Sequence, residues 1–333
     1  MVFQINPSKV PIWLSETEVR LGLEHDSQTI VGLGLAQERL LTMLYQPIAG
    51  NQLELVGASV GLDSEEIQGL IDQLKPSLIE ATRSGITETT DIRFAEIMRI
   101  GFDLGKQPAE VIANRANQII ELKALDRTGL TLIKALFEVG FRSFYAPDYG
   151  KVERSDLGKL GYSQHLLGHS RIDAAQRMIL SGDDSIVIWQ KLPTRKVVRL
   201  QVLTSNHAAI PSEYKALSKA HIAVEYSITS SSVSKVVVPR LDPCLSCRDH
   251  WAAEGDSHWT QTQIQLKARH DRLDDASSLL AAVSLATRNI CRFVDGNGLF
   301  ETENFEFNHR TGELSRTGWS FHSRCDCRDL AKN

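Results

Sequence analysis

The chain has 333 residues, of which 42% are hydrophobic, so it is long and apolar enough to fill the cores of two modest domains. This composition excludes an intrinsically disordered chain, and no apolar run approaches the roughly 20 residues that a membrane span needs. A formal net charge of −4 excludes a general attraction for nucleic acid, so any basic patch would have to be local.

The first 80 residues predict a small α+β domain. Alternating apolar residues between Val10 and Val31 indicate a β-hairpin and a further short strand. Apolar residues then recur at helical spacing in Leu35 to Tyr45 and in Ser64 to Leu74, where Ser64 is the expected N-cap, and a third helix is expected within Leu53 to Leu62. Strands with three helices predict a winged-helix-like unit at residues 1–80.

Winged-helix units are typical of DNA-binding regulators, but the expected recognition helix at residues 65–72 is acidic and would repel phosphate. A DNA-binding regulator therefore ranks last, and we expect a peptide ligand. An extended peptide would add to the edge of the hairpin while a neighbouring helix supplies a groove. The residues expected to contact the peptide are Trp13, Val19, Leu21 and Leu23.

Residues 81–117 carry no motif and predict a helical linker, whereas strand and helix patterns alternate from residue 118. A strand at 119–122, a helix at 129–139 and a strand at 143–146 predict a βαβ unit. In nucleotide-binding units of this type, glycines in the first turn admit phosphates and an acid after the second strand binds the ribose. The acid is present as Asp148, but the first turn keeps only Gly129.

Two thiol pairs lie far apart in the sequence, Cys244 with Cys247 and Cys325 with Cys327. No hydrophobic leader precedes the chain, so we expect a reducing, cytoplasmic compartment, where four thiols hold metal more often than two disulfides. Because Zn²⁺ binds four thiolates tetrahedrally, the pairs predict one structural zinc site. The alternative is two redox pairs or unrelated buried thiols. Cys291 lies in an apolar helical pattern, which favours a core thiol over a nucleophile.

Several motifs carry a resemblance to a known family. The segments Val139–Asp148 and Leu167–Arg171 resemble the ThiF-type adenylyltransferases of the ubiquitin-activating-like superfamily. Val236–Pro239, Pro243–Cys247 and Trp319–Cys327 resemble its actinobacterial branch, the precursor leader-peptide-binding proteins of azole and azoline peptide biosynthesis. The resemblance covers nearly the whole chain. It implies a Rossmann-like α/β ThiF-type domain at residues 118–333 that contains the zinc site, and a homodimer formed through this domain.

The resemblance also implies an ATP site, which is degraded here. Its remnant is assigned to Gly129, Asp148, Lys159, Arg171 and Asn206. Family members that adenylate a carboxylate have a glycine-rich turn, and Ala124, Asp126 and Arg127 stand at three of its glycine positions. Asn206 stands at the position of the magnesium-binding aspartate, and a neutral amide is a weak ligand for Mg²⁺. These losses favour a protein that has lost the binding of ATP and Mg²⁺.

The leading hypothesis is therefore a non-catalytic recognition component. It would bind a precursor leader peptide and present it to a separate modifying enzyme, such as a YcaO-type cyclodehydratase. The alternative is an ATP-dependent adenylyltransferase that activates the C-terminal carboxylate of a peptide or protein. Peptide binding without ATP distinguishes the first hypothesis, and pyrophosphate release distinguishes the second.

Overall fold

The computed structural model describes residues 2–23, 27–81, 94–106, 108–179, 186–206, 218–267, 269, 271–296 and 302–328. The chain divides into two compact units, Met1–Asn114 and Arg115–Asn333. None of the described helices combines the length and the apolar character that a membrane span requires.

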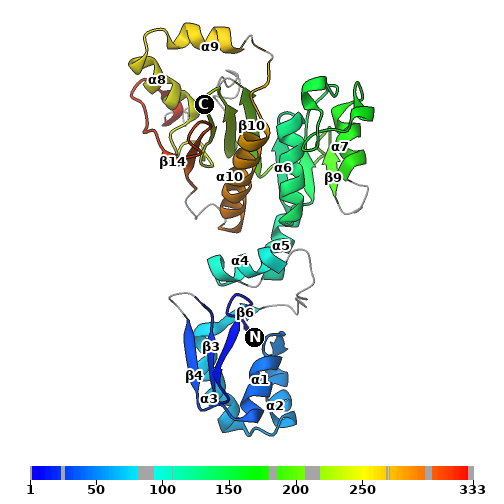
Figure 1. The fold of residues 1–333 in the computed structure, drawn as a ribbon, viewed down its shortest axis with the longest axis vertical. Helices are drawn as coiled ribbons and strands as arrows, with labels where there is room; N and C mark the ends of the chain where they lie inside the picture. The colour runs from blue at the N-terminus through cyan, green and yellow to red at the C-terminus, as the bar shows by residue number, and fades with distance from the viewer. Residues whose placement is uncertain are drawn as a thin grey trace. The chain divides into compact units, whose positions relative to one another are not determined.

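The first unit is an α+β unit whose described strands form two three-stranded sheets, in the orders β5-β1-β6 and β2-β3-β4 (Figure 1). Its elements in chain order are β1 (Val2–Ile5), β2 (Pro11–Ser15), β3 (Glu18–Leu21), β4 (Gln28–Val31), α1 (Leu35–Met43), β5 (Ile48–Ala49), α2 (Gly50–Ser59), α3 (Ser64–Leu74), η1 (Lys75–Ser77), β6 (Leu78–Ala81) and α4 (Phe94–Leu104). Helix α5 (Pro108–Asn117) extends past the boundary between the units.

Helix α3 illustrates how the sequence fixes an element of this unit. Its N-cap is Asp63 and not the predicted Ser64, because the Asp63 side chain accepts a hydrogen bond from the Glu66 N–H at 2.8 Å and the Glu66 side chain accepts one in return from the Asp63 N–H. The helix packs closely on α2, since a Cβ at Gly57 would lie 2.3 Å from the Ile67 side chain. The absence of a side chain at Gly57 therefore allows α2 and α3 to approach each other closely.

The described strands of the second unit form one eight-stranded sheet in the order β14-β13-β12-β11-β10-β7-β8-β9. Its elements are β7 (Ile119–Leu122), α6 (Arg127–Glu138), β8 (Ser143–Tyr145), η2 (Arg154–Asp156), η3 (Gln164–Leu166), α7 (Arg171–Ile179), β9 (Val187–Trp189), β10 (Leu200–Asn206), β11 (His221–Tyr226), β12 (Ser230–Val233), α8 (Leu245–Gly255), α9 (Trp259–Lys267), α10 (Ala276–Asp295), β13 (Asn304–Asn308), β14 (Leu314–Thr317) and η5 (Asp326–Arg328).

The strand order places a switch point in this sheet. Strands β7 to β11 pair in parallel, and β12 to β14 extend the sheet with antiparallel pairs. The chain runs from β7 outward to β8 and β9, and then returns to the other side of β7 to form β10. In open α/β sheets, ligands bind in the crevice that such a reversal leaves at the carboxyl ends of the strands.

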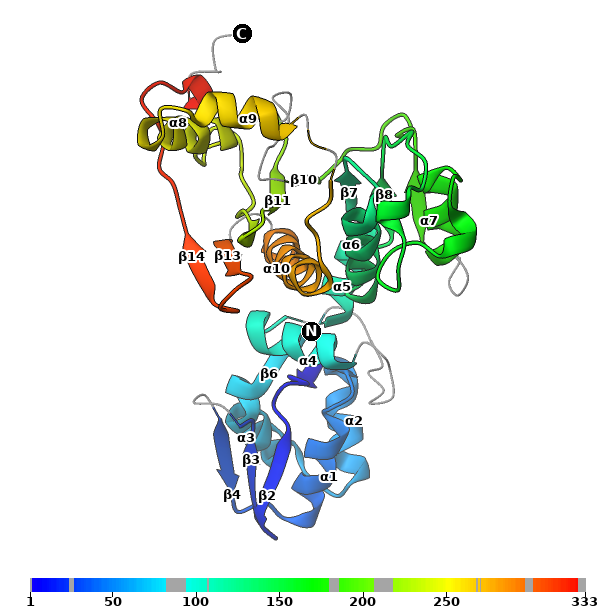
Figure 2. The ribbon, with the colours of Figure 1, turned by 45° about the horizontal axis from the view of Figure 1, so that its top comes forward.

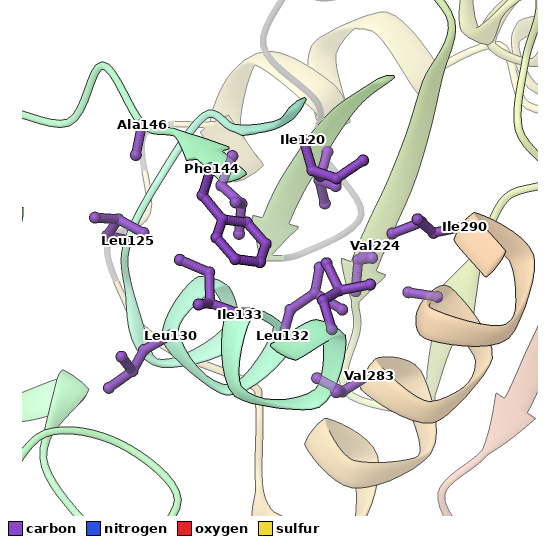
Figure 3. Close-up of a cluster of buried hydrophobic side chains, with 14 of the residues drawn as sticks. Ile120, Leu125, Leu130, Leu132, Ile133, Phe144, Ala146, Val224, Val283 and Ile290 are labelled. Carbon is purple, nitrogen blue, oxygen red and sulfur yellow. The ribbon is translucent and has the colours of Figure 1, made fainter. Parts of the chain in front are cut away.

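Helices α6 and α10 lie side by side over one face of this sheet (Figure 2). Apolar side chains from β7, β8, β11 and the two helices fill the layer between them (Figure 3). They include Ile120, Phe144, Val224, Ile133, Val283 and Ile290, all of which are buried. Burial of these side chains holds the carboxyl ends of β7 and β10 at a fixed separation, which positions the residues of the crevice.

A buried ion pair joins α5 to the end of α10 within the second unit. The Arg115 guanidinium donates from Nε to Asp295 Oδ1 at 2.8 Å and from Nη2 to Asp295 Oδ2 at 2.5 Å, and its Nη1 donates to the Val139 carbonyl at 2.7 Å. Both side chains are almost fully buried. Each charge therefore depends on the other for its compensation.

Replacing Asp295 by Ala should destabilise the second unit by roughly 3–5 kcal/mol, because it removes the carboxylate that accepts two hydrogen bonds from the buried Arg115 guanidinium. Urea unfolding monitored by circular dichroism measures this loss. Glu303→Ala is the matched control, since Glu303 pairs with Arg316 at the surface and its loss should cost less than about 1 kcal/mol. Similar small losses in both variants would contradict the assignment of the buried pair.

Candidate functional site

The switch-point crevice holds a concentrated group of charged side chains. They come from the turn between β7 and α6, from the segment between β8 and α7, and from the segment that precedes α10. The carboxylates are Asp126, Asp148, Asp156 and Asp274, and the guanidiniums are Arg127, Arg171 and Arg272. The described residues of the group carry one more negative than positive charge.

Arg272 links two of the carboxylates. Its Nη1 lies 2.8 Å from Asp126 Oδ2, while its Nη2 and Nε lie 2.8 and 3.0 Å from the two oxygens of Asp274. Burial by itself lowers the pKa of the Arg272 guanidinium, but the charges of Asp126 and Asp274 outweigh burial and raise it. The Arg272 guanidinium is therefore held in ion pairs with Asp126 and Asp274 of the same chain.

Arg171, the first residue of α7, makes a second set of ion pairs. Its Nε and Nη2 lie 3.0 and 2.8 Å from Asp156 Oδ2, and its Nη1 lies 3.7 Å from Asp148 Oδ2. Asp156 has no exposed surface. The pKa of Arg171 is raised because attraction to Asp156 exceeds the lowering caused by burial. Arg171 thus neutralises a carboxylate that no solvent reaches.

Asp148 holds the two turns that frame the crevice. Its Oδ2 accepts from the Leu125 N–H at 2.7 Å and its Oδ1 accepts from the Gly150 N–H at 2.6 Å. The side chain is buried, with only 7% of its surface exposed. Each oxygen of the carboxylate that the sequence assigns to ribose hydroxyls therefore already accepts one backbone hydrogen bond.

The helix that would receive a phosphate begins with a carboxylate instead. Asp126 is the N-cap of α6, and its Oδ1 accepts from the Gly129 N–H at 2.9 Å. A Cβ at Gly129 would lie 2.1 Å from the Ala124 carbonyl oxygen, so this glycine serves the tight turn itself. Helix N-termini favour anions, and Asp126 supplies that anion from within the chain.

The structure brings four of the five predicted remnant residues to this crevice. Gly129, Asp148 and Arg171 lie within the charged group, and Asn206 Oδ1 accepts from the Leu273 N–H at 2.9 Å beside it. Lys159, the fifth, is exposed on the turn after η2. Arg272 and Asp274 were not predicted from the sequence. Their only sequence signal is the charged run at residues 271–275 immediately before an apolar helix.

The four predicted zinc-ligand cysteines gather at one point. The Sγ atoms of Cys244 and Cys325 lie 3.5 Å apart, as do those of Cys247 and Cys327, and the Sγ atoms of Cys244 and Cys247 are 4.0 Å apart. All four thiol sulfurs lie within 4.8 Å of one another. Bonds of about 2.3 Å from a central ion to four thiolates place the sulfurs about 3.8 Å apart, so the group fits one tetrahedral metal ion.

Neighbouring side chains fix the two chain segments that carry these thiols. Trp319 Nε1 donates to the Cys244 carbonyl at 3.0 Å, next to the start of α8. His322 is buried, and its Nδ1 accepts from the Arg324 N–H, so its Nε2 carries the proton and donates to Glu254 at 3.0 Å. His322 therefore supports the segment beside the thiols. Burial raises the pKa of the Cys327 thiol to about 11, so binding a metal would release protons.

The predicted peptide-contact residues of the first unit fall into two groups. Val19 and Leu21 have no exposed surface, because they occupy the inward face of the central strand β3 and belong to the core. Trp13 and Leu23 are 40% and 74% exposed. The alternating pattern predicted a strand correctly, but it did not distinguish the core-facing residues from the exposed ones.

The sheet β2-β3-β4 has two edges with different properties. Strand β2 begins with Pro11 and contains a register shift after Trp13, and prolines and bulges obstruct the addition of another strand. Strand β4 has neither feature. The Gln28 side chain accepts from the Ser77 hydroxyl at 2.7 Å and donates to the Gln73 carbonyl, so β4 lies beside the end of α3. Edge β4 thus combines a regular strand with a neighbouring helix.

No family model and no curated protein matches the sequence, but solved structures share the fold. The crystal structure of Escherichia coli MccB with ATP superposes with a TM-score of 0.67 at 12% identity, covering 98% of this chain and 99% of that chain. The microcin C7 biosynthetic enzyme MccB in complex with N-formylated MccA gives 0.66 at 12% identity, covering 98% of this chain and 100% of that one.

A heterocyclase solved with substrate and cofactor gives a TM-score of 0.65 at 16% identity, and the match covers 99% of this chain but 40% of the heterocyclase. At these identities the comparisons establish the fold. They confirm the predicted mixed α/β architecture, and the fold shared with MccB extends over nearly the whole chain.

The thiol cluster should hold one metal ion per chain. Cys327→Ser should lower both the metal content and the melting temperature, because the two distant segments then lose a shared ligand set. Elemental analysis and thermal unfolding of the same preparation measure the two effects. Cys291→Ser is the control, since the buried Cys291 lies on α10 outside the cluster, and it should keep the ion. An unchanged metal-to-protein ratio in Cys327→Ser would contradict the four-thiol site.

Proposed function

We propose that the chain is a non-catalytic recognition component that binds the leader segment of a precursor peptide and presents it to a separate modifying enzyme, such as a YcaO-type cyclodehydratase. One observation carries the proposal. The crevice in which this fold would bind a nucleotide is occupied by the protein's own ion pairs, centred on Arg171 and Arg272. The solved neighbours support a peptide as the partner, because MccB was crystallised with MccA.

The energetics of the crevice support the loss of adenylation. A triphosphate that paired with Arg171 or Arg272 would leave their buried carboxylates without a countercharge, and an unpaired buried charge costs roughly 3–5 kcal/mol. Asp126 adds a negative charge at the start of α6, where phosphate would lie. Asn206 offers a neutral amide whose oxygen already accepts a hydrogen bond from Leu273. Transfer of a nucleotidyl group depends on positioned positive charge, and among the described side chains of this crevice carboxylates outnumber guanidiniums by four to three.

The rival function is an ATP-dependent adenylyltransferase that activates a peptide or protein carboxylate. The observation in its favour is that MccB was solved with ATP and has the same fold. Adenylation would require Arg171 or Arg272 to leave its carboxylates when nucleotide binds. The ion pairs described above oppose that rearrangement, so we rank this function second.

We place the peptide at edge β4 as an added strand of the sheet β2-β3-β4. Main-chain hydrogen bonds to an exposed strand edge supply affinity without regard to sequence, and flanking side chains supply selectivity. Val31 is 66% exposed on β4, and the α3 end forms the wall next to Gln28. Leu23, between β3 and β4, is available to the same peptide, whereas Trp13 flanks the opposite edge.

We propose further that the thiol cluster holds Zn²⁺ in a structural role. Four thiolates complete a tetrahedron and leave no open position for substrate, which distinguishes structural from catalytic zinc sites. The ion would connect Cys244 with Cys325, 81 residues later, and thereby close a long loop. Loss of zinc should release the terminal segment from α8.

A second copy of the chain is the proposed partner of the sheet face opposite α6. Parallel sheets are normally covered on both faces. On that face the side chains of Tyr145, Val187 and Trp189 stay partly exposed, while Phe144 and Ile188 of the same strands are buried towards α6. A homodimer formed there would cover them, as the family resemblance also implies.

The function is tested by selecting peptides from a displayed library of random 20-residue sequences on the full-length protein, without ATP. Enriched peptides should bind with micromolar affinity, and hydrogen exchange should slow at residues 28–31 and not at 11–15. Val31→Asp should weaken binding about tenfold, because it places a charge against the added strand. Leu14→Asp is the matched control, as Leu14 is an exposed apolar residue on the other edge.

Binding that required ATP and Mg²⁺ would contradict the recognition function and favour the adenylyltransferase. Protection of residues 11–15 would keep the function and move the peptide to edge β2.

A further inference from the structure

A groove lies between helices α8 and α9 and the sheet, on the face that α6 and α10 leave open. It consists of two adjoining cavities with volumes of about 220 and 340 Å³. The residues that line both cavities are Glu225, Ser232, Arg248, Ala252 and Glu306. Glu225, Ser232 and Glu306 stand directly opposite one another on β11, β12 and β13, and their neighbours Val224 and Val233 point into the core on the other face. The groove is therefore separate from the switch-point crevice.

The charges in the groove select against anions. Arg248 donates two hydrogen bonds to Glu225, one of them at 3.0 Å from Nη2 to Oε1, so these two charges cancel. Glu306 then leaves the lining with one net negative charge. A neutral or basic ligand fits this balance, and a carboxylate or phosphate does not.

The groove also offers a hydrogen-bond donor that lacks a partner. Trp259 lines the smaller cavity, and its indole nitrogen is buried next to it without an acceptor among the described residues, so a small rotation of the ring would be needed to present the N–H to the cavity. A buried unpaired donor costs about 1–3 kcal/mol, so an acceptor atom in this cavity would be stabilising. The hydroxyls of Ser227 and Ser230 lie along the same cavity. A carbonyl oxygen of a peptide backbone is the acceptor that suits this neutral, hydroxyl-rich setting.

The larger cavity has an aromatic wall. Trp251 and Trp319 line it together with Gly318, which has no side chain. Its volume of about 340 Å³ lies at the small end of the range for ligand pockets, roughly 300–1,000 Å³. The space therefore suits a single bulky apolar side chain better than a nucleotide or other large cofactor.

We propose that this groove is a second peptide-contact site, which takes an extended, uncharged or basic segment carrying one bulky apolar side chain. The Trp259 indole donates to a carbonyl of that segment, and the apolar side chain enters the aromatic cavity. This inference rests on the proposed function, because the segment would belong to the same precursor peptide that edge β4 holds. The groove thereby gives the second unit a part in selecting the peptide.

The tryptophans of the chain make the groove directly observable. The sequence contains five tryptophans. Trp251, Trp259 and Trp319 line the groove, whereas Trp13 lies in the first unit and Trp189 on β9. Full-length protein labelled with 5-fluorotryptophan should give five ¹⁹F resonances, each assigned by a single Trp→Phe substitution.

The probes are two short blocked peptides without a leader, N-acetyl-phenylalanyl-lysine amide and N-acetyl-phenylalanyl-glutamic acid α-amide, which differ in the sign of one side-chain charge. The basic probe should shift the resonances of Trp251, Trp259 and Trp319 saturably and leave those of Trp13 and Trp189 in place. The acidic probe should bind at least several-fold more weakly, and Glu306→Gln should reduce that difference. Trp259→Phe should weaken the basic probe about threefold to tenfold, the expected effect of one hydrogen bond. Leu280→Ala, at an exposed residue of α10 that lines neither cavity, is the control and should leave its affinity unchanged.

Equal shifts of all five resonances, or none up to the solubility limit of the basic probe, would overturn the groove proposal. The failure of the groove and of the proposed function are distinguishable. Binding of library-selected peptides at residues 28–31 without any probe binding removes only the groove. Probe binding without any library-selected peptide removes only the leader-recognition function.

Discussion

The arrangement of the switch-point crevice in the second unit depends on the ion pairs of Arg171 and Arg272. The sheet order creates a crevice at the ends of β7 and β10, and the chain fills it with carboxylates that need internal countercharges. Asp126 caps α6 and Asp148 holds the flanking turns, so the N–H groups of Gly129, Leu125 and Gly150 already donate to carboxylates of the chain. Under the proposed function this crevice is a scaffold, whereas MccB, which shares the fold, was crystallised with ATP.

The thiol cluster and the groove are parts of one local structure. Arg248, which follows Cys247 in the sequence, lines both cavities. Trp319 lines the larger cavity and donates a hydrogen bond to the Cys244 carbonyl. An ion held by the four thiols would therefore fix α8 over the sheet and keep the groove open. Peptide contact, in this account, is divided between a strand edge in the first unit and a side-chain groove in the second.

The sequence allowed the mixed α/β fold, the parallel βαβ unit and the meeting of four cysteines to be predicted, because periodicity and ligand spacing are local signals. Other features required the tertiary structure. Arg272 and Asp126 are 146 residues apart, and a charged run before a helix looks like ordinary solvent-exposed sequence. Alternation identified β3 as a strand but left open that Val19 and Leu21 face the core. Nothing in the sequence indicated that the indole N–H of Trp259 lacks an acceptor among the described residues.

Calorimetric titration of the metal-loaded, full-length protein with ATP and Mg²⁺ tests the central claim most directly. Escherichia coli MccB, which was crystallised with ATP, serves as the positive control under the same conditions. The closed crevice predicts no detectable heat of binding at nucleotide concentrations that saturate MccB. Magnesium-dependent binding at micromolar ATP would contradict it, since the ion pairs of Arg171 and Arg272 would then yield to the nucleotide.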